Sequence, residues 1–209
     1  MFVPFALAVP FLFLVPPLGL LLLGVGAFSA YFYRDPDREP AGEGVLAPAD
    51  GHVSVIREDG DRVRVGVFMS PFDVHVCRAP ADGEVTRLDH RGAAHRPAFV
   101  KESERNERFE YTLREDAGGA GDATEDGADA EPDGDAGHVD GALIAGWFAR
   151  RITPYVSPGD PVTRGARIGY IAFGSRADVV LPSGYTAENV RVSRGEAVRA
   201  GESVIARRD

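Results

Sequence analysis

The first 33 residues constrain the fold of this chain more than any other feature, because none of them carries a charged side chain. Leucine, phenylalanine, valine and alanine dominate this segment. As a single helix it would be about 50 Å long, whereas the hydrocarbon core of a bilayer is about 30 Å thick. It is too long for one straight span and too short for two, and Pro10 and Pro16-Pro17 interrupt it. We therefore expect a helical membrane segment, either a kinked span or a re-entrant hairpin.

The residues that follow indicate how this segment is oriented. Tyr31-Phe32-Tyr33 resembles an interfacial aromatic belt, and Arg34 and Arg38 come directly after it. The positive-inside rule then predicts a cell-membrane protein whose remaining chain lies on the cytoplasmic side. A cleavable signal peptide fits poorly, because a basic start and a clear small-residue cleavage site are both missing. Residues 34–44 are polar and rich in proline, so we expect a non-helical linker there.

From residue 45 onward the pattern is that of short strands. Apolar residues alternate with polar ones around Val53–Ile56 and Val63–Phe68, and glycine and aspartate turns separate these runs. No long amphipathic helix follows residue 40. We predict one all-β domain over residues 45–209, which the length of 209 residues allows.

Two internal echoes suggest the form of that domain. Ala47–Val53 recurs almost unchanged as Ala79–Val85, and Val162–Gly169 has a looser partner in Val192–Gly201. Each echo has the pattern of a strand, a glycine turn and a second strand, which predicts a small β-sandwich or barrel with pseudo-symmetric halves. The pattern is similar to the hammerhead half-barrels of biotinyl and lipoyl carrier domains. Carriers need an exposed lysine at a hairpin tip, and the sole lysine, Lys101, lies outside both turns.

Composition excludes several other classes of protein. The net charge of −9 argues against binding to nucleic acid, and Cys77 has no second cysteine with which to form a disulfide. The scarcity of lysine beside many acidic residues is typical of salt-loving organisms. Between about residues 114 and 140 the chain is mostly aspartate, glutamate, glycine and alanine, which predicts a disordered acidic insertion. We expect no metal, since neither EF-hand nor zinc-ligand spacing is present.

The histidines are the first candidates for proton transfer. His138 falls in the acidic insertion and is expected to be a solvated bystander, while His90 and His95 lie in an arginine-flanked segment that resembles a loop. His75 stands in the apolar alternation Phe72–Val76, where a buried ring needs either a structural partner or a function. The sequence leaves both readings of His75 open.

Two aspartates and one serine complete the candidates. Asp50 and Asp82 precede glycine in matching turns, where each could simply close the turn or could orient a histidine. Ser175 follows Gly174, and most Gly-Ser pairs are turns or linkers. A serine hydrolase would require a G-x-S-x-G elbow, but here glycine precedes the serine only at the adjacent position.

Several separated motifs together resemble one family. Met69–Pro80, with an Asp-Gly pair just after it, closely resembles the central motif of phosphatidylserine decarboxylases of the short prokaryotic type. Phe173–Asp178 resembles the self-cleavage site of that family, and Phe32–Pro36 and Asn106–Arg108 resemble further landmarks. The likeness covers roughly residues 31 to 181 outside the acidic insertion.

This resemblance implies a pyruvoyl enzyme. Ser175 would attack the carbonyl of Gly174, and elimination followed by hydrolysis would convert residue 175 into a pyruvoyl group, leaving subunits of residues 1–174 and 175–209. The pyruvoyl group would then act as the electron sink for decarboxylation of a serine phospholipid to the ethanolamine lipid and CO2. The substrate would be phosphatidylserine or, in a halophilic archaeon, archaetidylserine, and the resemblance leaves a homo-oligomer open.

The resemblance also implies roles for single residues. Asp50 matches an aspartate of the self-cleavage relay, and His75 matches the histidine that transfers protons during decarboxylation. Arg78 stands where longer relatives have a second histidine, so the base for self-cleavage is either His75 or Asp50 acting through water. Arg78, Asn106 and Arg176 are candidates for substrate binding, although Arg78 could equally form a structural ion pair. The alternative function is a catalytically silent, membrane-tethered β-sandwich that binds a partner.

Overall fold

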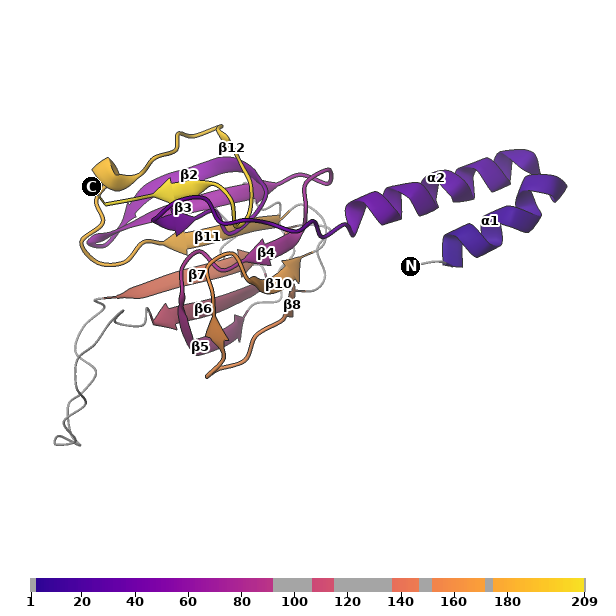
Figure 1. Ribbon diagram of the computed structural model, residues 1–209. Coiled ribbons are helices and arrows are strands. Elements are labelled where there is room, and N and C mark those ends of the chain that lie inside the picture. Colours follow the sequence, from indigo (N-terminus) through magenta and orange to yellow (C-terminus); the bar gives the residue numbers. More distant parts are fainter. Residues whose placement is uncertain (1–2, 92–106, 115–136, 147–151, 172–174, 209) are drawn as a thin grey trace.

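The computed structural model describes residues 3–91, 107–114, 137–146, 152–171 and 175–208. Its N-terminal part forms two helices, α1 (Val3–Leu14) and α2 (Pro16–Phe32). The two helices pack against each other as an antiparallel hairpin that projects away from the β domain (Figure 1). A Cβ atom on Gly19 would lie 2.4 Å from the Cα atom of Leu12, so glycine is what allows this close approach. A short 3-10 turn, Ala187–Asn189, lies in the C-terminal part of the chain.

The prolines act differently from one another in this hairpin. Pro10 lies inside α1 without ending it, whereas Pro16 stands at the first turn of α2, where its missing N–H costs nothing. The geometry is that of the hairpin rather than of the kinked span. Within the part of the chain that the structure describes, neither helix has both the length and the apolar character that crossing a membrane requires.

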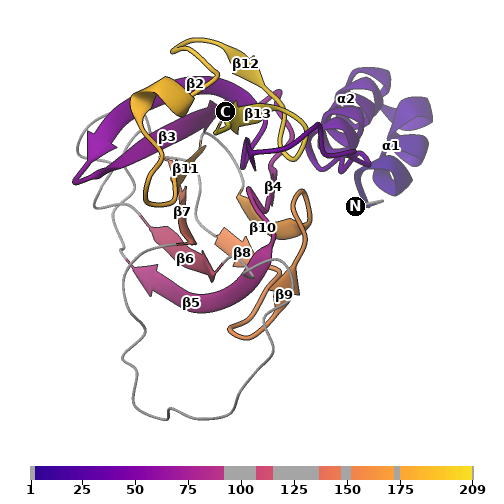
Figure 2. The same cartoon turned by 60° about the vertical axis from the view of Figure 1, so that its left-hand side comes forward.

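The rest of the chain is mostly β and forms three antiparallel sheets. Eight strands make up a sheet in the order β12-β2-β3-β11-β7-β6-β5-β9, which curls around the interior (Figure 2), while β4-β10-β8 and β1-β13 form smaller sheets. The strands are β1 (Val45–Leu46), β2 (Gly51–Asp59), β3 (Arg62–Met69), β4 (Val76–Arg78), β5 (Gly83–Arg91), β6 (Arg108–Arg114), β7 (His138–Ile144), β8 (Ile152–Pro154), β9 (Pro161–Val162), β10 (Arg167–Ile171), β11 (Ser175–Val180), β12 (Ala197–Val198) and β13 (Val204–Ala206).

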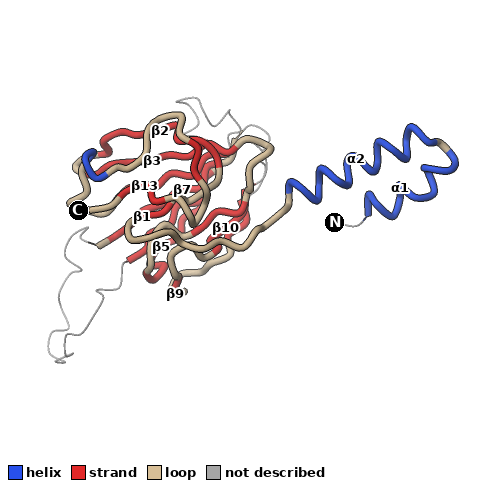
Figure 3. The backbone as a smooth tube through the Cα atoms, turned by 45° about the horizontal axis from the view of Figure 1, so that its top comes forward, coloured by secondary structure: helices blue, strands red, loops and turns tan. Residues whose placement is uncertain are grey.

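The core follows the alternation expected from the sequence. In β3, Val63, Val65, Val67 and Met69 are buried on one face, and β6 buries alternate residues in the same way. These side chains pack together with those of the smaller sheets into one hydrophobic core. The tube view in Figure 3 shows that the strands form one body and that the hairpin stands apart from it.

The predicted pseudo-symmetric halves are present. The backbone N–H of Leu46 donates to the carbonyl of Pro80 (2.9 Å), and the N–H of Arg78 donates in the same way to Pro48 (2.8 Å). These reciprocal hydrogen bonds connect the two Ala-Pro-Ala-Asp-Gly turns. Each turn also accepts a glycine N–H, from Gly201 in one half and from Gly165 in the other. The first echo therefore encodes two equivalent units packed around an approximate two-fold axis.

The second echo has a different register from the one predicted. The N–H groups of Gly159 and Gly195 donate to equivalent valines near the starts of β5 and β2. The structural repeat is therefore Ser157–Gly165 with Ser193–Gly201, six residues out of step with the predicted alignment. That alignment was wrong because it matched a short Val-x-Arg-Gly run, whereas the structure repeats the spacing of serine, glycine and an acidic residue.

Residues 34–44, the predicted linker, contain neither helix nor strand. They lie against the β domain, and we call them the strap. Asp35 pairs with Arg78 and Arg167, and Arg38 pairs with Asp50 at 2.8 Å. The strap therefore joins the hairpin to the domain through buried or half-buried ion pairs.

The predicted acidic insertion needs correction at one boundary. Residues 115–136 lie outside the described part of the chain, but His138–Asp140 belong to β7. Arg62 holds this end, because it pairs with Asp140 at 2.6 Å and donates to the carbonyl of His138 at 2.8 Å. His138 is therefore a strand residue, whereas the prediction placed it in a solvated insertion. Its backbone is fixed by pairing with Arg114 of β6 and by the hydrogen bond from Arg62.

His90 is also placed differently from the prediction. It belongs to β5, and its Nε2 atom lies 2.8 Å from Oε1 of Glu107, whereas a loop was expected there. His95 and Asn106 lie outside the described residues.

Candidate functional site

Two connections between the sheets come together at one end of the β domain. β3 pairs with β11, and β4 pairs with β10. The end of β3 therefore lies beside the start of β11, and the start of β4 lies beside the end of β10. Met69 stands opposite Ser175 in the first pair. In the second pair, the N–H of Ile171 donates to the carbonyl of His75 at 3.2 Å. The fold therefore places His75 beside Ile171, the last residue of β10, and Met69 beside Ser175, the first residue of β11.

His75 is fully buried directly before β4. Its Nδ1 atom lies 2.9 Å from the carbonyl oxygen of Asp73, and since a carbonyl can only accept, Nδ1 carries the hydrogen. Nε2 is then the basic nitrogen, and it is buried without a hydrogen-bond partner among the residues that the structure describes. Burial is the main cause that lowers the pKa of His75, so the ring is neutral near pH 7. An unpartnered buried base of this kind is typical of a functional residue.

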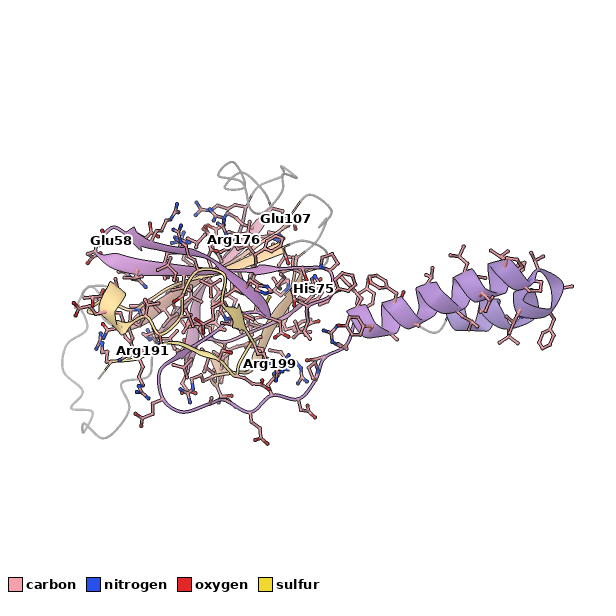
Figure 4. The ribbon with its side chains drawn as sticks, turned by 90° about the horizontal axis from the view of Figure 1, so that it is seen from above. Glu58, His75, Glu107, Arg176, Arg191 and Arg199 are labelled. Carbon is pink, nitrogen blue, oxygen red and sulfur yellow. The ribbon has the colours of Figure 1, made fainter. Side chains whose placement is uncertain are left out.

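The last turn of α2 covers this histidine. The ring of Phe32 lies on the imidazole of His75, with centroids 4.3 Å apart and an angle of 32° between the planes. Figure 4 shows His75 at the end of the β domain from which α2 projects. The sequence prediction treated residues 31–33 as an interfacial belt and Phe32–Pro36 as a family landmark, and it missed the contact with His75. The signal available was the Phe32–Pro36 landmark, which sequence alone could not connect to His75.

Ser175 is the first residue of β11 and is fully buried between β3 and β7. Its hydroxyl contacts Sδ of Met69 at 3.7 Å, which is a weak acceptor. Within the described part of the chain, this hydroxyl forms no hydrogen bond to His75 or Asp50. Gly174 lies outside the described residues. The structure thus brings the segments of Ser175 and His75 together without a direct hydrogen bond between their side chains.

Asp50 lies in the first Pro-Ala-Asp-Gly turn and is bound on both oxygens. Nη2 of Arg38 donates to the two oxygens at 3.0 and 2.8 Å, and the N–H of Ala200 donates to Oδ1 at 2.8 Å. Charge on Asp50 acts on His75 to raise its pKa, but less strongly than burial lowers it. Asp50 is therefore in the electrostatic neighbourhood of His75, while its direct partners are the strap and the C-terminal segment.

The two arginines predicted as substrate ligands have protein partners. Arg78 is bound by Asp35 at 3.0 Å, by the carbonyl of Pro36 at 2.8 Å and by the carbonyl of Gly165 at 2.9 Å. Arg176 makes a bidentate ion pair with Asp178, in which Nε donates to Oδ1 at 2.7 Å and Nη2 donates to Oδ2 at 3.0 Å. The geometry corresponds to the structural ion pair left open for Arg78, and a role of either arginine in substrate binding stays a prediction.

Surface hollows on the described residues do not coincide with these groups. One lies over the outer face of the large sheet between Arg64, Glu110 and Asp140, and another lies beside Glu43 and Arg164. Neither is lined by His75 or Ser175, both of which are completely buried. The candidate residues His75 and Ser175 therefore lie in the interior of the domain and outside these two hollows.

Comparison with known proteins connects this interior to a family. The family model described as phosphatidylserine decarboxylase matches residues 25–206. A Halobacterium salinarum protein named as an archaetidylserine decarboxylase proenzyme is 47% identical over 197 residues, covering 91% of this chain and 86% of the relative. A Thermobifida fusca phosphatidylserine decarboxylase proenzyme is 42% identical over 187 residues, covering 89% and 76%.

A third relative has a lower identity to this chain. A Methanopyrus kandleri protein, also named as an archaetidylserine decarboxylase proenzyme, is 39% identical over 206 residues, covering 91% of this chain and 87% of its own length. No solved structure matches the chain significantly.

Proposed function

Because the chain belongs to the phosphatidylserine decarboxylase family and is a decarboxylase of that family, we propose that it converts a serine phospholipid into the ethanolamine lipid and CO2. The substrate is phosphatidylserine or archaetidylserine. The observation that carries this proposal is the buried Nε2 of His75, which has no hydrogen-bond partner among the described residues, in a segment that pairs with the end of β10 at Ile171. A neutral imidazole in a dry interior can accept and return a proton.

The first step in the proposal is self-cleavage between Gly174 and Ser175. The hydroxyl oxygen of Ser175 attacks the carbonyl carbon of Gly174, the C–N bond breaks, and the acyl group moves from nitrogen to oxygen. Elimination then releases Gly174 as a carboxylate, and hydrolysis of the resulting dehydroalanine releases ammonia and leaves a pyruvoyl group. The hydroxyl contacts Met69 in the uncut chain, so it has to turn from the thioether toward a base.

We assign that base to His75. Both oxygens of Asp50 already accept hydrogen bonds from Arg38, and one also accepts from Ala200, so this carboxylate has little capacity left to take a proton. His75 has the free nitrogen that Asp50 lacks. Asp50 then acts as an ionised support that stabilises the protonated form of the nearby imidazole.

The architecture is suited to a chain that is cut and stays assembled. Residues 175–209 contribute β11, β12 and β13, and β11 lies between β3 and β7 in the middle of the large sheet. Strand pairing on both sides of β11 would keep the two subunits together after cleavage. The new N-terminus at residue 175 would remain in the interior.

The surroundings of Ser175 also fit a pyruvoyl group. The serine is completely buried and, among the described residues, its hydroxyl contacts the thioether of Met69, a weak acceptor that suits a methyl ketone better than a hydroxyl. When formed, the group supplies the ketone that acts as an electron sink for decarboxylation. His75 takes a proton from the ammonium group of the substrate and returns it to the carbon that has lost CO2.

The uncharged hairpin supports a membrane location for the reaction. Large apolar side chains on α1 and α2 are exposed, among them Phe13 (83%), Leu14 (76%) and Leu20 (63%). We infer that the hairpin inserts into the lipid from the cytoplasmic side, which would keep the enzyme where its substrate resides. Flotation with lipid vesicles tests this, because Phe13→Asp with Leu14→Asp should release the protein from the vesicles. Unchanged flotation of the double variant would contradict it.

The function is tested by release of labelled CO2 from phosphatidylserine and archaetidylserine carrying the label in the serine carboxyl group. The wild-type protein should release CO2, and hydroxylamine or borohydride, which attack carbonyls, should inhibit it. Ser175→Ala should be inactive. Inhibition by fluorophosphonates instead would indicate a serine hydrolase, and no release from either lipid would favour the catalytically silent binding module.

A further inference from the structure

The contact between Phe32 and His75 joins the end of the uncharged helix α2 to the interior of the β domain. Phe32 is the last residue of α2, a helix without charged side chains, yet only 1% of it is exposed. Its neighbours Tyr31 and Tyr33 are about half exposed. The one aromatic ring of this turn that is buried is therefore the ring that lies on the candidate catalytic base.

The last turn of α2 is attached to the β domain on both sides of this contact. The hydroxyl of Tyr31 and Nη2 of Arg34 both donate to the carbonyl of Phe72, at 3.1 and 2.7 Å. On the other side, the ring of Tyr33 stacks on Tyr170 with centroids 5.8 Å apart. These contacts fix how α2 meets the domain, and they place Phe32 over the imidazole rather than leaving its position to the flexibility of the hairpin.

The imidazole is constrained in turn by its two contacts. The hydrogen bond from Nδ1 to Asp73 sets the tautomer, and the stack on Phe32 limits rotation of the ring and excludes water from one face. A base must lie within hydrogen-bond reach of the proton that it moves, so small changes in its orientation have large effects on rate.

We propose that Phe32 is a positioning residue for His75, so that the last turn of α2 forms one wall of the catalytic site. The proposal rests on the proton-transfer role given to His75 above. It assigns the hairpin a second task beside its proposed attachment to the membrane. The helix that meets the lipid also holds the base in its productive orientation.

The charged groups around His75 allow the effect of Phe32 to be separated from theirs. Burial is the largest influence on the pKa of His75 and lowers it. Asp73 and Asp50 act to raise this pKa, and Arg34 acts to lower it. Phe32→Ala changes none of these charges and removes part of the apolar cover. A shift of the His75 titration in this variant therefore reports the loss of cover.

The test is a 15N NMR titration of the histidine side chains in full-length Ser175→Ala protein, which cannot cleave itself. His75 is identified by the signal that is missing in a His75→Gln variant. With Phe32→Ala added, the titration midpoint of His75 should move up toward about 6.5, the value of a solvated imidazole. Phe13→Ala, a matched change at the exposed end of the hairpin, should leave the midpoint in place, and Phe32→Leu should give an intermediate shift.

An unchanged midpoint and tautomer of His75 in both Phe32 variants would overturn the proposal. Because this measurement needs no catalysis, its result is independent of whether the proposed function is correct. Phe32→Leu keeps most of the apolar cover, so the question stays decidable even if Phe32→Ala fails to fold.

A second arm uses the processed enzyme and a short-chain lipid dispersed in detergent, where membrane attachment has no effect. Phe32→Ala should lower kcat roughly tenfold to a hundredfold with little change in KM, and should move the acid limb of the pH profile upward. Phe13→Ala should differ from wild type only with vesicles. Full recovery of Phe32→Ala in detergent would mean that Phe32 acts only as an anchor and would contradict the proposal.

Discussion

The two Ala-Pro-Ala-Asp-Gly turns share one sequence and one backbone shape, but they have different partners. Gly51 and Gly83, which end the turns, both have positive φ angles, of 136° and 153°. In each turn the aspartate accepts a backbone N–H, from Ala200 at Asp50 and from Arg164 at Asp82. Asp82 is exposed at the surface, whereas the side chain of Asp50 is only 13% exposed and is bound by Arg38 of the strap.

The strands beside the two turns differ in a similar way. β1 pairs with β13 close to the C-terminus, whereas β4 is preceded by His75 and pairs with β10, which leads toward Ser175. The repeat therefore supplies two equivalent turns with different surroundings. Asp50 of the first turn meets Arg38 of the strap, whereas His75, which Phe32 of α2 covers, precedes the strand that leads into the second turn.

The largest effect is expected from Gly51→Ala in the first turn. An added Cβ would lie 2.0 Å from the carbonyl oxygen of Phe68, and φ is already in the region that favours glycine. We expect a loss of about 3 to 5 kcal/mol in the free energy of unfolding, measured by urea denaturation. Gly60→Ala also has positive φ but meets open space, so it should lose only about 1 to 2 kcal/mol. Equal losses would show that the close approach at Gly51 does not matter.

The next test compares the two aspartates directly. Asp50→Asn breaks a nearly buried ion pair and leaves Glu202, at 3.2 Å, as the remaining acidic partner of Arg38, so we expect the free energy of unfolding to fall by about 2 to 3 kcal/mol. Asp82→Asn keeps an acceptor for Arg164 at the surface and should change it by less than about 0.5 kcal/mol. Urea denaturation of the two variants measures both. Similar losses in the free energy of unfolding would mean that the two turns contribute equally and that the pairing of Asp50 with the strap does not stabilise the fold.

Arg78→Lys separates a structural from a substrate-binding arginine. Lysine cannot reproduce the fork that joins Asp35, Pro36 and Gly165, so we expect a loss of about 2 kcal/mol in the free energy of unfolding. The KM for the lipid should stay within about twofold in those molecules that fold. A KM raised tenfold or more at unchanged stability would instead identify Arg78 as a phosphate ligand.

The smallest effect concerns pH. The pKa of His75 is lowered in the folded chain, so the unfolded chain binds more protons as pH falls through about 6.5, and the folded state loses stability there. Wild-type protein should therefore lose more stability than His75→Gln between pH 7.5 and pH 5, measured by denaturation at both values. An identical pH dependence of the two proteins would show that His75 is not buried as a neutral base.

The fold could be predicted from the sequence where the signal was local. Alternation around Val63–Phe68 predicted strands, the matching turns predicted paired halves, and the proline pair at Pro16-Pro17 indicated a break in the helical segment. The register of the second repeat could not be predicted, because the hydrogen bonds of Gly159 and Gly195 that define it reach strands far away in sequence.

The site was predicted in its residue types but not in its contacts. The family resemblance indicated His75 and Ser175, since the motifs around them are specific. That Arg38 binds Asp50 and that Phe32 covers His75 depends on how the strap and α2 fold back onto the domain. The local sequence of Arg34–Pro40 does not predict which side chains of the β domain these residues contact.

The central claim, that this chain makes its own catalytic group by breaking the bond before Ser175, is tested most directly by intact-protein mass spectrometry. After incubation under native conditions, the purified wild-type protein should give two fragments, residues 1–174 and residues 175–209, the second blocked by a pyruvoyl group at its N-terminus. Ser175→Ala should remain a single chain. A wild-type protein that stays at 22.4 kDa throughout would contradict the account.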